Sequence, residues 1–166
     1  MKYALLLVAC VALPLATFAD AFSGSTWKEY VNARFGFKIS HPAELVASPD
    51  PANGGGREYH TKDKEFSVSV EGHFLNGATL ESFWAEDLKK LGSHITYKKK
   101  TADWYVVSGV KDGLEFYHKL HVKDGNWAEV SFTYPHAKAK EYDPWVEGIV
   151  KSFVPFLQGD YDRIVK

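Results

Sequence analysis

Cysteine is almost absent from this sequence of 166 residues, since the only one stands at position 10. A single cysteine cannot form an internal disulfide bond, and it excludes every zinc site built from several thiolates. An excess of charge of one sign is also lacking, because 20 Lys and Arg residues stand against 21 Asp and Glu residues. With a net charge of −1 the chain has no basic excess for wrapping a phosphate backbone, so we expect no nucleic-acid partner.

Sequence signatures of catalysis are lacking as well. The chain holds no Gly-x-Ser-x-Gly nucleophile elbow, no His-Glu-x-x-His zinc motif and no glycine-rich dinucleotide fingerprint. We therefore expect a protein that is not an enzyme and that carries no cofactor. The residues that are present, 45% hydrophobic and 25% charged, are typical of a globular domain.

The one long hydrophobic run lies at the N-terminus. Lys2 precedes the mostly apolar residues 4–18, and the small residues Ala19 and Ala21 mark a cleavage site. We interpret residues 1–21 as a cleavable secretory signal peptide. This interpretation predicts a periplasmic or secreted protein.

The remainder, residues 22–166, is expected to form one domain with no transmembrane span. Two alternatives to cleavage stay open. One is a membrane anchor, although the apolar run is shorter than the roughly 20 residues that a span needs. The other is lipid attachment at Cys10, because Leu7-Val8-Ala9-Cys10 resembles a bacterial lipobox.

Five segments alternate apolar and polar residues with the two-residue period of a half-buried β-strand. They are 35–39, 66–74, 104–110, 114–122 and 127–134. The pairs Asp112-Gly113 and Asp124-Gly125 separate the last three segments, and Asp-Gly pairs favour tight hairpin turns. The sequence therefore predicts an antiparallel meander of three strands near the middle of the chain.

Two segments have the 3.6-residue period of a helix instead. Thr79 is the expected N-cap of the first helix, and Gly92 ends it. Asp143 is the expected cap of the second, with Pro144 at its first position and Pro155 as its stop. Along the chain, the predicted order is strands, a helix, three strands and a second helix. This order indicates the α+β class, with an antiparallel sheet and flanking helices.

Two motifs and the order of these elements resemble the PsbP-like fold. The motifs are YVNARFGFKISHP at residues 30–42 and YDPWVEGIVKSF at residues 142–153. The resemblance implies an α/β/α sandwich and an accessory or binding role, and it implies no particular reaction. Asn53 to Arg57 also resembles an Asn-Gly-Asp-Gly-Arg run of exported bacterial members, with Gly55 in place of the acid.

The run Asn53, Gly54, Gly55, Gly56 and Arg57 is the first candidate binding site. Successive glycine amides can converge on an anion while an arginine fork donates to a carboxylate or phosphate. The alternative interpretation is a wide turn between strands, because no Lys-Ser/Thr pair and no helix follow the glycines.

A second candidate surface lies on the meander. If odd-numbered residues share a face, Tyr117, His121 and Trp127 combine aromatic area with polar groups, as protein-binding surfaces do. The alternative is that the second helix covers this face. His118 and His121 are three residues apart, so a strand points them to opposite faces and we expect no metal site there.

The sequence thus favours an exported, non-catalytic module that binds a periplasmic protein or a small ligand. One alternative is an inhibitor or immunity-type protein that acts against an exported enzyme. Another alternative is a metal-dependent hydrolase that uses His121 with His73 or His60.

Cleavage after Ala21 predicts that the mature chain begins at Phe22. Intact-mass measurement of the protein isolated from its native compartment should give the unmodified mass of residues 22–166. A lipid-modified N-terminus at Cys10, or retention of Met1, would contradict the prediction.

Overall fold

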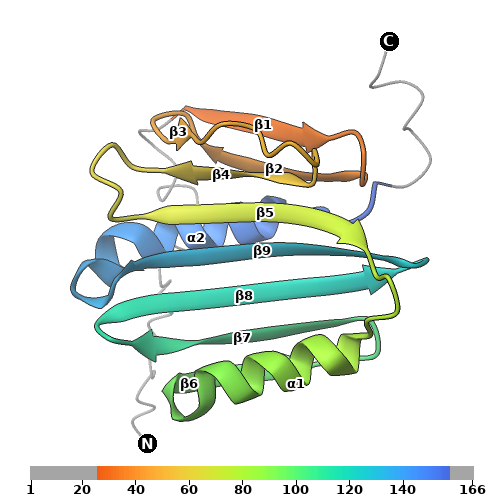
Figure 1. Cartoon of the computed structure of the whole chain (residues 1–166). Coiled ribbons are helices and arrows are strands. Elements are labelled where there is room, and N and C mark those ends of the chain that lie inside the picture. Colours follow the sequence, from red (N-terminus) through yellow and green to blue (C-terminus); the bar gives the residue numbers. More distant parts are fainter. Residues whose placement is uncertain (1–25, 158–166) are drawn as a thin grey trace, which may run out of the picture.

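The computed structural model describes residues 26–157, and Figure 1 shows it as a layered α+β fold. A seven-stranded antiparallel sheet has the strand order β3-β4-β5-β9-β8-β7-β6, and β1 and β2 form a separate two-stranded hairpin. The expected signal peptide, its cleavage site and Cys10 lie outside the described residues. The strands are β1 (Trp27–Asn32), β2 (Phe37–Pro42), β3 (Val46–Ala47), β4 (Gly56–His60), β5 (Ser67–Phe74), β6 (Ile95–Lys100), β7 (Trp104–Lys111), β8 (Leu114–Lys123) and β9 (Asn126–Pro135).

The predicted meander is confirmed as β7, β8 and β9. Asp112 and Gly113 have φ values of 52° and 79°, and Asp124 and Gly125 have φ values of 49° and 79°. Positive φ at both central residues is the geometry of a two-residue type I′ hairpin. On its other side β9 pairs with the earlier strand β5, from Ser67↔Thr133 to Phe74↔Asn126.

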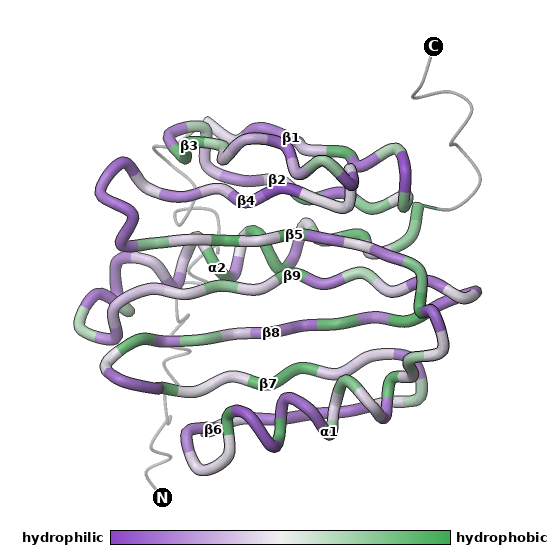
Figure 2. Tube along the Cα trace, in the orientation of Figure 1, coloured by the Kyte–Doolittle hydropathy of each residue, from purple (hydrophilic) through white to green (hydrophobic). Residues whose placement is uncertain are grey.

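The helices lie on opposite faces of the sheet (Figure 1). Helix α1 (Leu80–Leu91) packs on the face toward the viewer, where its residues join Tyr105, Val107 and Leu120 in one apolar cluster. Helix α2 (Ala139–Ser152) and the β1–β2 hairpin pack on the other face, against β5 and β9. Hydrophobic and hydrophilic segments alternate along the strands in Figure 2, as a sheet with two distinct faces requires. Neither helix in residues 26–157 is long and apolar enough to cross a membrane.

The boundaries of α1 match the sequence prediction, whereas those of α2 do not. Thr79 accepts a hydrogen bond from the Ser82 amide at 3.1 Å, and Gly92 ends the helix with a φ of 52°. Helix α2 begins at Ala139, which places Pro144 inside the helix and not at its first position. Asp143 does not cap it. Its carboxylate instead accepts a hydrogen bond from the Tyr134 hydroxyl at 2.9 Å.

Strands β1, β2, β3, β4 and β6 depart from the sequence prediction. The first predicted strand begins at Phe37, because Gly36 lies in the turn after β1 with a φ of 68°. The segment expected as a wide turn ends early, since Gly56 already belongs to β4. Strands β1, β3 and β6 were not predicted, and β6 lacks alternation because three lysines end it.

Gly56 lies where β4 meets β5 most closely. A Cβ atom at this position would overlap the carbonyl oxygen of Val70 and come within 2.7 Å of the Glu71 Cα. Because both atoms belong to the backbone, no side-chain rearrangement relieves the overlap. Only glycine allows the paired strands to keep this spacing.

We expect Gly56→Ala to lower the free energy of unfolding by about 3 kcal/mol, through displacement of β4 from β5. The matched control is Gly125→Ala, where φ is 79° and a Cβ meets nothing within 4 Å. That control should lose only about 1 kcal/mol, the cost of a left-handed alanine. Urea unfolding followed by tryptophan fluorescence measures both, and equal losses would contradict the prediction.

Candidate functional site

Strand register divides the candidate residues between two faces. Trp104 pairs with His121 across β7 and β8, and Tyr117 pairs with Phe132 across β8 and β9. Residues paired across two antiparallel strands point to the same face, and in both pairings an odd-numbered residue faces an even-numbered one. The odd-numbered side chains of β8 therefore point to the opposite face from the odd-numbered side chains of β7 and β9. The predicted odd-numbered face is therefore wrong. Trp127 lies on the α1 face, whereas Tyr117 and His121 lie on the α2 face.

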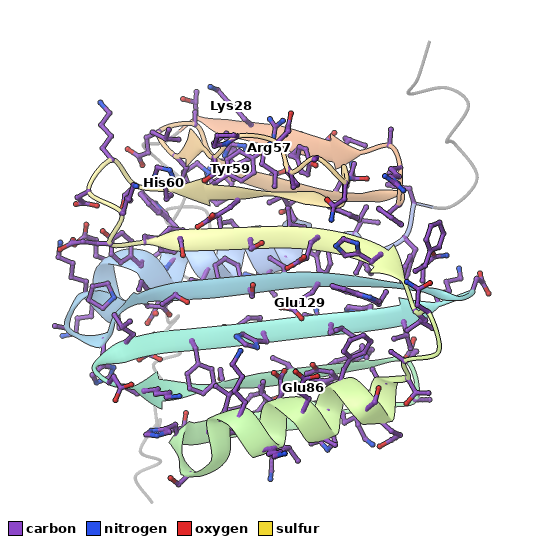
Figure 3. The ribbon with its side chains drawn as sticks, viewed as in Figure 1. Lys28, Arg57, Tyr59, His60, Glu86 and Glu129 are labelled. Carbon is purple, nitrogen blue, oxygen red and sulfur yellow. The ribbon has the colours of Figure 1, made fainter. Side chains whose placement is uncertain are left out.

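Each helix covers one half of one face, so the opposite half remains uncovered by the described residues. On the α1 face the uncovered part lies over β4, β5 and β9, and we call it the front half-face (Figure 1). Its side chains are polar. They are Glu58, His60, Ser67, Ser69, Glu71, His73, Glu129, Ser131 and Thr133. In Figure 3, Glu129 lies in front of the sheet beside α1, which carries Glu86.

The chain between β3 and β4 closes over the edge of the front half-face. A hollow of about 230 Å³ lies between this loop and the strands. Residues of the loop form one wall, and residues of β4 and β5 form the floor. The lining residues are Ser48, Pro49, Pro51, Asn53, Gly55, Gly56, Arg57, Glu58, Ser69, Glu71 and His73.

The loop is held in place from both sides. The Asn32 side chain donates to the Gly54 carbonyl at 3.0 Å, and Arg34 donates to the Asn53 carbonyl. The Gly72 amide of β5 donates to the Gly55 carbonyl at 2.7 Å. A wall fixed by these bonds is ordered before any ligand arrives, which lowers the entropic cost of binding.

The glycine run does not form the anion cradle that was one of its two interpretations. The Gly54 amide donates to the Pro51 carbonyl at 2.9 Å, and the Gly55 amide donates to the Asn53 side chain at 3.0 Å. Arg57 is bonded to Asp50 and stacks over the Tyr30 ring. The Gly54 and Gly55 amides and Nη2 of Arg57 are thus already used, whereas the buried Nε of Arg57 has no hydrogen-bond partner among the described residues. Asn53, Gly55, Gly56 and Arg57 line the hollow, while Gly54 faces a second hollow beside β1.

A cluster of ionisable groups joins the front half-face to α1. Asp87 of α1 accepts a hydrogen bond from the Tyr105 hydroxyl at 2.8 Å and lies 3.4 Å from Nδ1 of His118. Burial opposes charge on both Asp87 and His118, but their mutual contact outweighs it. The contact lowers the pKa of Asp87 and raises the pKa of His118.

In Glu129, by contrast, burial outweighs the groups that favour the charged form, which are His118 and the Ser131 hydroxyl. Burial raises the pKa of Glu129 to about 7; His118 opposes this rise, and the nearby carboxylates Asp87 and Glu71 add to it. Glu71 stands directly opposite Glu129 on the neighbouring strand. Like charges in this position repel, so the sheet favours the neutral form of Glu129 near physiological pH. Sequence reasoning missed this cluster, because only the strand register brings its members together.

The histidines proposed for a metal site do not assemble. His121 lies on the opposite face of the sheet from His60 and His73. On the front half-face, His60 pairs with Ser67 while His73 lies six residues further along β5, about 20 Å away. No group of three or more metal-ligating side chains occurs within residues 26–157. The arrangement required by the hydrolase alternative is therefore contradicted.

Comparison with solved structures identifies the architecture. No protein-family model matches the sequence, and no curated protein matches it. The solution structure of cyanobacterial PsbP (CyanoP) from Synechocystis sp. PCC 6803 superposes with a TM-score of 0.60 at 9% identity. The match covers 86% of this chain and 99% of that one. The fold is PsbP-like.

A second structure has the same arrangement of elements. It is a crystal structure of a Bacteroides thetaiotaomicron VPI-5482 protein, with a TM-score of 0.53 and 15% identity. The match covers 80% of this chain and 49% of that protein. Both likenesses show the fold alone, and they confirm the predicted PsbP-like sandwich.

The raised pKa of Glu129 predicts that stability falls as the pH rises. The folded state binds the proton up to about pH 7, whereas the unfolded chain releases it near pH 4.3, so the wild-type protein loses stability between these values. Glu129→Gln removes the buried charge and should be about 2 kcal/mol more stable than wild type at pH 8.

Urea unfolding of both proteins at pH 4 and pH 8 measures this difference. At pH 4 the two should differ little, because Glu129 is neutral in wild type. His118 and Asp87 are present in both proteins, and the variant also removes from His118 the Glu129 charge that helps to raise the pKa of His118. A stability difference that is the same at both pH values would contradict the raised pKa.

Proposed function

We propose that the protein is an exported, non-catalytic binding module that holds a small ligand in the hollow of the front half-face. The observation that carries this proposal is the hollow of about 230 Å³ between an anchored loop and a polar sheet surface. Four of the five residues in the predicted Asn53 to Arg57 site line it. The PsbP-like fold and the expected signal peptide support an accessory role outside the cytoplasm.

The free polar groups of the hollow define the chemistry of the ligand. The Gly54 and Gly55 amides and Nη2 of Arg57 are bonded within the chain, and Nε of Arg57 is buried, so the groups that face the hollow are mainly acceptors. Glu58 and Glu71 contribute carboxylates, and Ser69 contributes a hydroxyl group. Carboxylates bind amines and sugar hydroxyls, which donate hydrogen bonds, and they repel anions. The ligand is therefore a small molecule with amine or hydroxyl donors.

The position of the hollow also supports binding without catalysis. Glu71 and His73 form the only acid–histidine contact among its lining residues, at 3.4 Å. Both side chains are partly open to solvent, with relative exposures of 42% and 28%. An open polar surface allows reversible binding, whereas acid–base catalysis gains most from a site that excludes water.

Thermal-shift screening of the mature protein tests the proposal. The panel contains diamines, basic amino acids and monosaccharides, with phosphate and citrate as anionic comparators. We expect a donor-bearing compound to raise the melting temperature and the anions to have no effect. Calorimetry on the compound found should show affinity about tenfold weaker for Glu71→Gln, because a charge-assisted hydrogen bond is lost.

The matched control is Glu141→Gln, an exposed glutamate of α2 on the opposite face. This variant should bind as wild type does. The proposal fails if no donor-bearing compound stabilises the protein, if the anions stabilise it instead, or if Glu71→Gln binds with unchanged affinity.

A further inference from the structure

The α2 face has an uncovered half of its own, over β6, β7 and β8. Within residues 26–157, α2 and the β1–β2 hairpin pack against the other half of this face, on β5 and β9. We call the uncovered part the back half-face. Its principal side chains are Tyr97, Lys99, Trp104, Tyr117, Lys119 and His121. It therefore includes two of the predicted partner-binding residues, Tyr117 and His121.

Two lysines converge on one tryptophan at the centre of the back half-face. The ammonium groups of Lys99 and Lys119 each lie 5.6 Å from the centre of the Trp104 ring. His121, which is paired with Trp104 across β7 and β8, stacks on the same ring, with ring centroids 5.9 Å apart. The cation–π geometry fixes both lysines beside the same aromatic ring.

Neither lysine has a carboxylate partner among the described residues, whereas four other described lysines do. Lys100 follows Lys99 on β6, points to the α1 face, and pairs with both carboxylate oxygens of Glu81. Lys38, Lys138 and Lys151 also have acidic partners. The two lysines over Trp104 are thus positive charges placed together without neutralisation inside the described chain.

Burial adds to the cost of this arrangement. Lys119 is half-buried, and burial lowers the pKa of its ammonium group. Lysines on an edge strand commonly protect the sheet from pairing with other sheets, and this role suits β6. Lys119, however, lies on β8, an interior strand with partners on both sides. Edge protection does not explain it.

We propose that the back half-face is a docking surface for an acidic segment of a protein partner, with carboxylates seated between Lys99 and Lys119 over Trp104. Tyr97, which is 53% exposed, and Tyr117 flank the lysines and supply apolar contact area. Aromatic rings beside charged groups are the composition of protein interfaces. Opposite charge on the partner neutralises the pair and orients the segment.

A protein segment fits this surface better than a membrane does. Recognition of anionic lipids by charge uses clusters of about four to eight basic residues, whereas two lysines and aromatic rings form this centre. A hollow of about 410 Å³ lies beside His121, lined by the end of β8, by Pro155 and Phe156, and on one side by Asp103. It is large enough to accept a side chain that neighbours the acidic residues.

Nuclear magnetic resonance of ¹⁵N-labelled mature protein tests the docking surface. The probe is a short synthetic peptide in which Glu alternates with Ser. We expect the indole N–H signal of Trp104, assigned with Trp104→Phe, to shift on addition of the peptide and to recover at high salt. In Lys99→Ala/Lys119→Ala the affinity should fall at least about tenfold.

Three comparisons make the result specific. Lys98→Ala removes an exposed lysine from the same strand but from the other face, and it should bind the peptide as wild type does. A peptide with Gln in place of Glu should leave the Trp104 signal unchanged, and so should phosphatidylglycerol vesicles. The proposal is overturned if the acidic peptide leaves Trp104 unmoved, if Lys98→Ala weakens binding equally, or if only vesicles bind. The small-ligand hollow lies on the other face, so failure of either proposal leaves the other testable.

Discussion

The width of the sheet determines where this protein can bind anything. Six spacings between seven strands give a sheet about 29 Å wide, whereas one helix with its side chains is about 10 Å across. A single helix on each face therefore leaves part of that face open. In this fold α1 and α2 cover opposite halves, and the β1–β2 hairpin extends the cover beside α2. The two uncovered half-faces follow directly from this mismatch in size.

The two half-faces differ because the covered regions around them differ. Beside the front half-face, Asp87 of α1 contacts His118. Glu129 faces Glu71, and burial raises the pKa of Glu129 so that its neutral form is favoured. Beside the back half-face no acidic residue within residues 26–157 pairs with Lys99 or Lys119, so in the described part of the chain those charges are not neutralised next to Trp104. One sheet thus presents an acceptor-rich surface on one side and a basic, aromatic surface on the other. The sites differ in chemistry although they share the same strands.

The sequence predicted the elements that local patterning controls. The Asp-Gly hairpins and the Thr79 cap of α1 depend on residues close in the chain, and the structure confirms them. Helix α2 was placed one turn too late, because Pro144 is tolerated inside the helix and the preceding residues Ala139 to Tyr142 continue it. Strand β6 was missed because its lysine run has no alternation. Its conformation depends on pairing with β7.

The composition of each candidate site could not be predicted in the same way. Which side chains share a face depends on the register, that is, on which residue of one strand pairs with which residue of the next. The sequence pattern alone does not determine that register. Between β8 and β9, Tyr117 pairs with an even-numbered residue, which places Trp127 on the opposite face. Between β5 and β9, odd-numbered residues pair with odd-numbered ones, which places Glu71 opposite Glu129. The glycines at 54 to 56 were recognised as unusual, but their role in close strand approach and loop anchoring required the long-range contacts.

Opposite placement of the half-faces has a consequence for assembly. A molecule bound over β4 and β5 on one side cannot collide with a segment bound over β6 to β8 on the other, because the sheet lies between them. Both positions can be filled at the same time, in either order, without steric competition. A chain of this size can then act as a bridge that carries a small cargo on one side while it stays attached to a larger assembly through the other.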